Sequence, residues 1–170
     1  MEVFGLGVLL AGESGIGKSE IALGLISRGH RLVADDAVMI SLAEDQTLLG
    51  ACPELLKDFL EVRGLGILNI KNMFGDSAVK YQVSLDLIVK FVDINSSVIL
   101  ESNRLLGMHS EQEILGVIAP EVTVPIGPGR NISVLIESAV RNHKSKLNGY
   151  NAAEDFLQRQ KNYMESKNDC

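Results

Sequence analysis

Eight consecutive residues near the start of the chain have the types and spacing of a phosphate-binding loop. The segment Gly12-Glu13-Ser14-Gly15-Ile16-Gly17-Lys18-Ser19 fits the pattern G-x-x-x-x-G-K-[ST] at every required position. Glycines let successive backbone N–H groups turn toward one anion, and the helix expected after the loop directs its free amides to the same point. We expect Lys18 to reach the outer phosphates and the Ser19 hydroxyl to ligate a Mg²⁺ that bridges phosphate oxygens.

Two adjacent carboxylates, Asp35 and Asp36, are the candidates for chemistry beside this loop. They follow the short apolar segment 31–34, which we expect to be a strand of a parallel sheet. The carboxyl ends of such strands form the ligand-binding edge of open α/β folds. One carboxylate would orient the metal or its water, and the other would accept a proton from an attacking hydroxyl. The alternative is that both carboxylates only cap a turn, but the neighbouring loop favours a functional role.

The hydrophobic pattern predicts an α/β domain that positions these residues. An apolar run at 5–11 predicts a buried strand, and the helical spacing over 18–28 ends at Gly29, a residue typical of helix C-termini. The glycine-rich stretch 60–70 is predicted to be a shaped loop, and the tail from Glu165 is expected to fray. The other predicted elements are a hairpin within 36–49 with its turn at 44–46, a short helix at 53–59, strands at 81–92 and 122–126, and helices at 131–146 and 152–164.

Composition limits the class of protein and its partners. The chain has 170 residues, of which 46% are hydrophobic, as expected of one globular domain. A net charge of -6 gives no overall positive field, so neither nucleic acid nor anionic lipid is an expected partner. No apolar run approaches the roughly 20 residues that span a bilayer, and no secretory signal is visible. Two cysteines, Cys52 and Cys170, form no disulfide framework, which predicts a cytoplasmic protein.

Four segments together resemble a known family. The stretches 8–20, 28–36, 60–69 and 123–131 resemble, in order and interval, the catalytic domain of HPr kinase/phosphorylase. This resemblance implies a P-loop nucleotide-binding, phosphoenolpyruvate carboxykinase-like fold with a central β-sheet flanked by helices and a C-terminal helical pair. It also implies that residues 1–170 form a single catalytic domain, without the separate N-terminal domain of the family.

The same resemblance implies an activity, cofactors and partners. Enzymes of this family phosphorylate a serine of HPr, a phosphocarrier protein, with ATP or pyrophosphate. They reverse the modification by phosphorolysis, in which inorganic phosphate attacks phosphoserine and pyrophosphate leaves. ATP and Mg²⁺ are therefore the implied cofactors, HPr is the implied protein partner, and a homohexamer is the implied assembly.

Roles for individual residues follow from the resemblance. It assigns Gly12 to Ser19 to the nucleotide phosphates, Ser19 and Glu61 to Mg²⁺, and Asp36 to acid/base catalysis. Lys18 and Arg104 fall on positions that stabilise the transferring charge. The remaining matched positions lie in the two signature segments or beside the base: Asp35, Arg63, Gly64, Gly66, Pro125, Pro128, Gly129 and Arg130.

The sequence also departs from the family pattern. A catalytic histidine usually precedes the first strand, and the chain begins after that position; the abrupt start at Met1 suggests an isolated domain. Gly127 occupies a position where the family commonly has a basic residue, which weakens the case for phosphorolysis more than the case for kinase activity. In the last predicted helix, Phe156, Leu157 and Tyr163 either face a neighbouring subunit or pack on the domain's own core.

Two other functions are consistent with a phosphate loop. A small-molecule P-loop kinase is one alternative, although no arginine-rich lid is visible beyond Arg104 and Arg130. A nucleotide-responsive binding module without catalysis is the other. Three histidines and Cys52 receive no catalytic role, because no metal-ligand spacing or activating base accompanies them.

Overall fold

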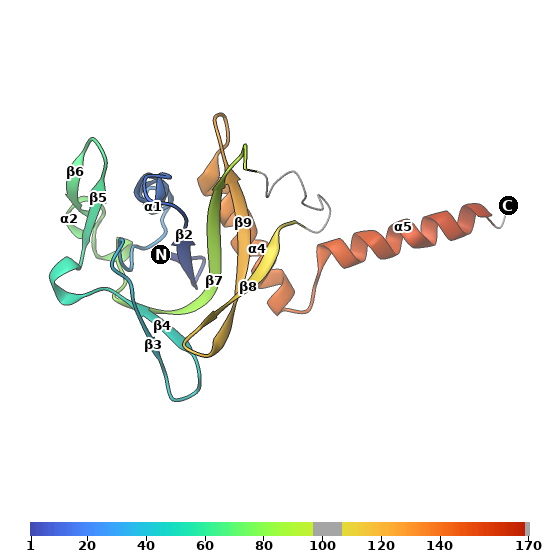
Figure 1. Cartoon of the computed structure of the whole chain (residues 1–170), viewed down its shortest axis with the longest axis horizontal. Coiled ribbons are helices and arrows are strands. Elements are labelled where there is room, and N and C mark those ends of the chain that lie inside the picture. Colours follow the sequence, from blue (N-terminus) through green and yellow to red (C-terminus); the bar gives the residue numbers. More distant parts are fainter. Residues whose placement is uncertain (97–106, 169–170) are drawn as a thin grey trace.

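A seven-stranded mixed sheet forms the centre of the molecule in the computed structural model, which describes residues 1–96 and 107–168 (Figure 1). Five strands follow the order β1-β2-β7-β4-β3, and β9 pairs with β7 on one side and β8 on the other. The sheet strands are β1 (Glu2–Val3), β2 (Leu6–Ala11), β3 (Met39–Leu42), β4 (Leu48–Ala51), β7 (Gln82–Asp93), β8 (His109–Ile114) and β9 (Val117–Ile126).

Helices and one separate hairpin complete the fold. The hairpin consists of β5 (Phe59–Val62) and β6 (Gly66–Asn69), which pair only with each other among the described strands. The helices are α1 (Lys18–Ile26), α2 (Ile70–Phe74), α4 (Ile132–Leu147) and α5 (Ala152–Asn168), with short 3₁₀ turns η1 (Glu54–Leu56) and η2 (Asp76–Ala78). The sheet flanked by helices confirms the predicted α/β fold class.

The long strand β7 organises the sheet. Its first residues pair antiparallel with β4, and its later residues pair parallel with β2 on one side and β9 on the other. Leu87, Ile88, Val89 and Phe91 are buried, as expected of a strand covered on both faces. Because β2, β7 and β9 run parallel, their carboxyl ends meet at one edge, where the segments 12–17 and 127–130 leave the sheet.

The main core lies where α1 and α4 pack beside the sheet. Leu25 and Ile26 of α1 and Ile136 and Val140 of α4 are almost fully buried and belong to the same hydrophobic cluster as Phe91. Beneath them, Arg28 and His30 both bond to Glu137 of α4, which joins the end of α1 to α4. This packing holds the start of α1 at the sheet edge.

Several predicted elements are confirmed. The strand predicted at 5–11 is β2, the helix over 18–28 is α1 with Gly29 at a φ of 91°, and the hairpin within 36–49 is β3–β4. The predictions at 81–92 and 131–146 correspond to β7 and α4. Asn131 caps α4 by accepting a hydrogen bond from the Val134 N–H at 3.2 Å.

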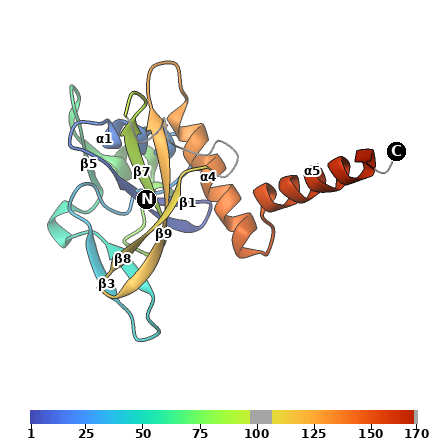
Figure 2. The same cartoon turned by 45° about the vertical axis from the view of Figure 1, so that its right-hand side comes forward.

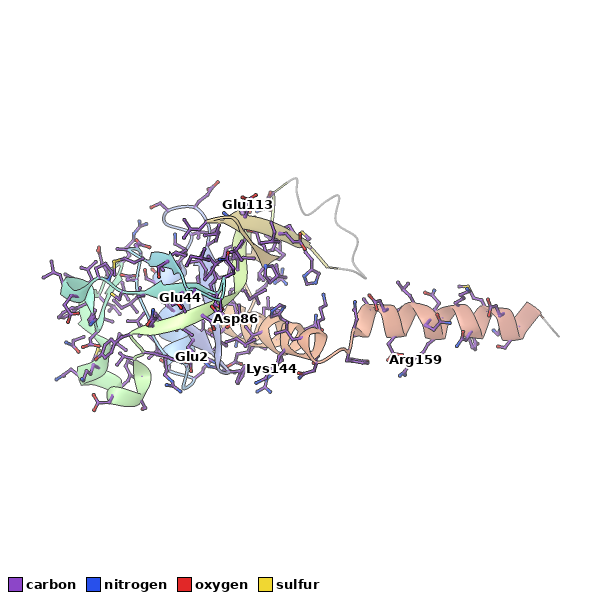
Figure 3. All side chains as sticks on the ribbon, turned by 90° about the horizontal axis from the view of Figure 1, so that it is seen from below. Glu2, Glu44, Asp86, Glu113, Lys144 and Arg159 are labelled. Atoms are coloured by element: carbon purple, nitrogen blue, oxygen red, sulfur yellow. The ribbon has the colours of Figure 1, made fainter. Side chains whose placement is uncertain are left out.

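The prediction of a strand at 31–34 is wrong. Arg31 and Leu32 make only isolated bridges, to Glu2 and to Val79. The physical reason is that β1 pairs with β2 and occupies the position that a parallel strand would need. Instead, the segment is attached through Glu2, which is labelled in Figure 3. This buried carboxylate pairs with Arg31 at 3.2 Å and with Lys80.

Four other predictions need correction. The stretch 60–70 is not a loop, because 60–69 forms most of the β5–β6 hairpin, whose turn is at 63–65. The helix expected at 53–59 is only the turn η1, and Phe59 already belongs to β5. The strand predicted at 122–126 is longer, and its antiparallel partner β8 was not predicted. The tail from Glu165 does not fray at once, since α5 continues to Asn168.

The last helix extends away from the rest of the domain. Figures 1 and 2 show α5 leaving the end of α4 and pointing outward, and Figure 3 shows its side chains, Arg159 included, standing around an uncovered helix. Phe156, Leu157 and Tyr163 are 50%, 42% and 61% exposed, so the interpretation that they pack on the domain's own core is wrong. Within residues 1–96 and 107–168, no helix is long and apolar enough to span a bilayer.

Candidate active site

The predicted phosphate loop lies between the end of β2 and the start of α1. Gly15 and Gly17 have φ angles of 82° and 99°, in the left-handed region that side chains disfavour, and Gly17 is the residue that precedes α1. Gly12 has a φ of 154° and is also crowded, because a Cβ there would lie 3.2 Å from the carbonyl oxygen and the Cβ of Phe91. The loop therefore packs against β7 and directs the free N–H groups of α1 toward its interior.

Lys18 lies along this loop. Its Nζ donates to the carbonyl oxygens of Gly12 and Glu13, at 3.2 Å each. These contacts hold the ammonium group inside the curve of the loop, where the outer phosphates of a nucleotide are expected. Ser19 is the second residue of α1, so its hydroxyl lies at the N-terminal end of the helix, next to Lys18.

Asp35 and Asp36 share a cavity with Lys18, although the strand expected before them is absent. The cavity has a volume of about 70 Å³ and is otherwise lined mainly by apolar residues of β2, β4 and β7 and of segment 33–34. Asp36 is exposed at its rim, whereas Asp35 is half-buried. Burial raises the pKa of Asp35 above its usual value, and the neighbouring Asp36 and Glu61 carboxylates raise it further, against a hydrogen bond from Glu61 that lowers it.

The β5–β6 hairpin brings one further predicted residue, Glu61, to Asp35 and another, Arg63, to the phosphate loop. Leu60 and Val62 are buried in the core, and the alternation of a strand turns Glu61 and Arg63 to the other, exposed face. The Glu61 N–H donates to Asp35 Oδ2 at 2.9 Å. The Arg63 guanidinium lies against the phosphate loop, because a Cβ added to Gly15 would be 3.6 Å from Arg63 Nη2. Gly64 and Gly66, at φ angles of 86° and 82°, allow the tight turn that follows.

The second signature segment leaves the same edge of the sheet. Pro125 pairs with Val92 at the end of β9, and the segment with Pro128, Gly129 and Arg130 continues from there, with Arg130 exposed. At Gly127 a Cβ would lie 2.7 Å from Ile94 Cγ2, so a side chain at this position requires Ile94 to move. Arg104 lies outside the described residues.

The residues predicted to hold a metal are Ser19 and Glu61. Among residues 1–96 and 107–168, no three His, Cys, Asp or Glu side chains form a group that would hold a metal ion by themselves. A cation in this site would take most of its ligands from phosphate oxygens and water, which is how Mg²⁺ commonly binds in kinases. Asp36 and Glu61 lie near enough to Asp35 to raise its pKa, and the negative charge of this region favours a bound cation without enclosing one.

Chemically, the arrangement can hold a polyphosphate next to an exposed base. The loop and Lys18 have the geometry expected of an anion site, and Asp36 is an accessible carboxylate on the same cavity. Sequence reasoning missed the hydrogen bond between Asp35 and Glu61, since 26 residues separate the two and no local pattern indicates it. The three histidines lie elsewhere: His30 is buried against Glu137, and His109 and His143 line a groove on the α4 side of β8 and β9.

Comparison with known proteins agrees with this geometry. The model of the HPr Serine kinase C-terminal domain matches residues 1–160. An HPr kinase/phosphorylase of Chromobacterium violaceum is 47% identical over 164 residues, which cover 96% of this chain and 52% of that protein. The corresponding protein of Alkaliphilus metalliredigens is 46% identical over 168 residues, which cover 98% of this chain and 53% of that protein. The chain thus spans about half the length of the curated relatives it matches.

A solved structure supports the same relationship in three dimensions. The Hpr(Ser) kinase/phosphatase from Coxiella burnetii superimposes with a TM-score of 0.82 at 37% sequence identity. The superposition covers 91% of this chain and 93% of the other. With a matching family model over nearly all of its length, a conserved fold and a complete phosphate loop, this chain belongs to the HPr serine kinase C-terminal domain family.

Proposed function

We propose that residues 1–170 form a single catalytic domain that transfers a phosphoryl group from ATP to a serine of HPr and also catalyses the reverse phosphorolysis. The observation that carries this proposal is that Lys18, inside the phosphate loop, and Asp36, an exposed carboxylate, line one cavity beside β2 and the beginning of β7. The name of the relatives, HPr kinase/phosphorylase, supports HPr as the substrate.

The phosphate loop and its neighbours would bind and neutralise the nucleotide. Backbone N–H groups of 12–19 surround the phosphates, and Lys18 offsets the charge that develops during transfer. Ser19 and Glu61 would hold Mg²⁺, which supplies charge neutralisation on the phosphate oxygens when bound. Arg63 lies close enough to Gly15 to contribute a second cation, and Arg104 is proposed for the same task.

Asp36 would act on the acceptor. In the kinase direction its carboxylate takes the proton of the serine hydroxyl, whose oxygen forms the new P–O bond as the bond to ADP breaks. In phosphorolysis an oxygen of inorganic phosphate attacks phosphoserine, and Asp36 returns the proton to the serine oxygen as pyrophosphate forms. Pyrophosphate serves as an alternative donor by the exact reverse of this step. The exposure of Asp36 supports a protein substrate, because a loop of HPr needs access to the rim.

The remaining proposals concern phosphorolysis, assembly and location. Pro125 to Arg130 would contact the incoming phosphate, with Arg130 as its cation, because this segment leaves the same sheet edge as the phosphate loop. We propose a homohexamer in which the exposed apolar residues of α5 contact a neighbouring subunit or its HPr. The buried Cys52 is a free thiol, which is consistent with the proposed cytoplasmic location.

One labelling experiment separates the candidate functions. The purified chain is incubated with Mg²⁺, purified HPr and ATP labelled at its γ-phosphate, and an HPr whose acceptor serine is replaced by alanine serves as the control. Label on wild-type HPr alone supports the proposal. Label on a small metabolite instead of HPr would indicate a small-molecule kinase, and nucleotide binding without any transfer would indicate a binding module.

A further inference from the structure

We propose that Asp35 is a positioning residue that ties the β5–β6 hairpin to the segment that carries Asp36. In this role its carboxylate sets the distance between the proposed base and two hairpin residues: Glu61, proposed for the metal, and Arg63, whose guanidinium lies against the phosphate loop. The inference rests on the proposed function for its catalytic consequence. Its structural part, the anchoring of β5, stands on contacts within the chain.

The anchoring contact replaces a missing strand. Glu61 lies opposite Ile67 in the hairpin, yet its N–H donates to Asp35 Oδ2 at 2.9 Å and therefore faces the free edge of β5. A strand edge presents a row of N–H and C=O groups that need partners. Segment 31–34 does not join the sheet as a strand, so it offers no backbone acceptor to this edge. The Asp35 side chain supplies the acceptor instead.

The core alone does not fix the position of β5 along this edge. Leu60 and Val62 are 0% and 3% exposed, and their burial determines which face of β5 points inward. The apolar contacts are not directional, so they fix the position of the strand along this edge less sharply than a hydrogen bond does. A hydrogen bond is directional, and the bond to Asp35 is the described contact that links the backbone at Glu61 to the segment of Asp36.

The surroundings of Asp35 explain why this role matters. Asp35 is half-buried beside an apolar cavity, with the like-charged Asp36 and Glu61 as neighbours. A carboxylate in such a place loses solvation and experiences repulsion, both of which disfavour the charged form. The hydrogen bond from the Glu61 N–H offsets part of the free-energy cost of charging Asp35. It also fixes the positions of Asp36, Glu61 and Arg63 relative to one another.

The catalytic consequence follows from geometry. Arg63 is two residues beyond Glu61, in the turn directly after β5, and its guanidinium lies against Gly15. A shift of β5 therefore moves both side chains relative to the phosphate loop, while the loop itself stays fixed between β2 and α1. Loss of the anchor should slow phosphoryl transfer and leave nucleotide binding nearly unchanged.

Two variants separate anchoring from charge. Asp35→Asn keeps a side-chain oxygen that accepts from the Glu61 N–H, whereas Asp35→Ser keeps a polar side chain that is too short to reach it. Asp45→Ser is the matched control, because Asp45 also accepts from a backbone N–H, that of Thr47 at 3.1 Å, in the β3–β4 turn away from the cavity. All three substitutions are polar and are expected to preserve the fold.

The first readout is amide hydrogen exchange by NMR, which needs neither substrate nor metal. We expect the Glu61 amide to exchange at least about tenfold faster in Asp35→Ser and within about threefold of wild type in Asp35→Asn. The Ile70 amide, which donates to the Asp58 carbonyl at 2.7 Å at the base of the same hairpin, is the internal reference and should not change. Unchanged Glu61 exchange in Asp35→Ser would overturn the anchoring role.

The second readout is turnover with HPr and ATP. Asp35→Ser should lower kcat by about 10- to 100-fold, with ATP affinity within about threefold of wild type, and Asp35→Asn should retain most of kcat. An Asp35→Asn enzyme as slow as Asp35→Ser, with normal Glu61 exchange, would show that Asp35 acts through its charge and would contradict the proposal. If wild type itself transfers no label to HPr, the proposed function fails, while the exchange result still decides whether Asp35 anchors β5.

Discussion

Replacing Glu137 by glutamine should destabilise the domain in a pH-dependent way. Glu137 receives two hydrogen bonds from Arg28, at 2.8 and 2.6 Å, and lies 2.9 Å from His30 Nε2. Its side chain is 14% exposed, and the Arg28 guanidinium, followed by His30, lowers the pKa of Glu137 from 4.5 to about 2. Glutamine keeps the shape of the side chain and removes the charge, so the variant tests the ion pairs rather than the packing.

The magnitude follows from the shift in pKa. The difference between 4.5 and about 2 corresponds to about 3.4 kcal/mol at 1.36 kcal/mol per pH unit. The Arg28 side chain is 43% exposed, and solvent screening reduces this upper bound to about 1–2 kcal/mol. Because the folded-state pKa of this carboxyl is depressed, the contribution is complete above about pH 5 and is lost as the pH falls through about 2.

Urea unfolding followed by circular dichroism measures this contribution. At pH 7, Glu137→Gln should be less stable than wild type by about 1–2 kcal/mol, and at pH 3 less than half of that difference should remain. Glu165→Gln is the control, because Glu165 lies on α5 with its side chain 64% exposed. A stability difference that is the same at pH 7 and pH 3 would refute the reasoning, since it would show that the charge of Glu137 contributes nothing.

Three further predictions concern packing, catalysis and assembly. Gly7→Ala should lower the free energy of unfolding, measured by thermal unfolding, by more than about 3 kcal/mol, because the new Cβ would lie 1.7 Å from the Ser84 carbonyl oxygen. Gly50→Ala is the control and should fold normally, because its Cβ would have no neighbour within 3.7 Å. Lys18→Ala should slow the transfer of label from ATP to HPr by at least about 100-fold. A near-normal rate in this labelling assay would exclude Lys18 from catalysis. Phe156→Asp should change the thermal unfolding midpoint little, since this side chain is 50% exposed, but should reduce the oligomeric mass measured by light scattering; an unchanged mass would contradict the proposed use of α5.

The phosphate loop and its helix could be predicted because their signals are local. Glycine positions, Lys18 and the apolar spacing of α1 all lie within one short stretch, and each residue type reflects a backbone or charge requirement of that stretch. The same holds for α4, where Asn131 at the start and the helical spacing of apolar residues agree with each other. Where local signals agree, the predicted element and the observed element coincide.

The wrong predictions depend on which segments pair. The apolar residues of 31–34 indicate an extended conformation, but β1 already pairs with β2, so this segment does not lie next to β2. In 60–69 the alternation of buried Leu60 and Val62 with exposed Glu61 and Arg63 is a strand pattern that the glycines obscured. Strand β8 carries almost no apolar alternation, because it is exposed along its length, and its pairing with β9 alone defines it.

Asp36→Asn tests the central claim most directly. The variant keeps the size of the side chain at the rim of the cavity and removes its ability to accept a proton at neutral pH. We expect ATP affinity within about threefold of wild type and transfer of label from ATP to HPr slowed by about 100-fold or more. Transfer at the wild-type rate would contradict the assignment of Asp36 as the base and, with it, the proposed mechanism.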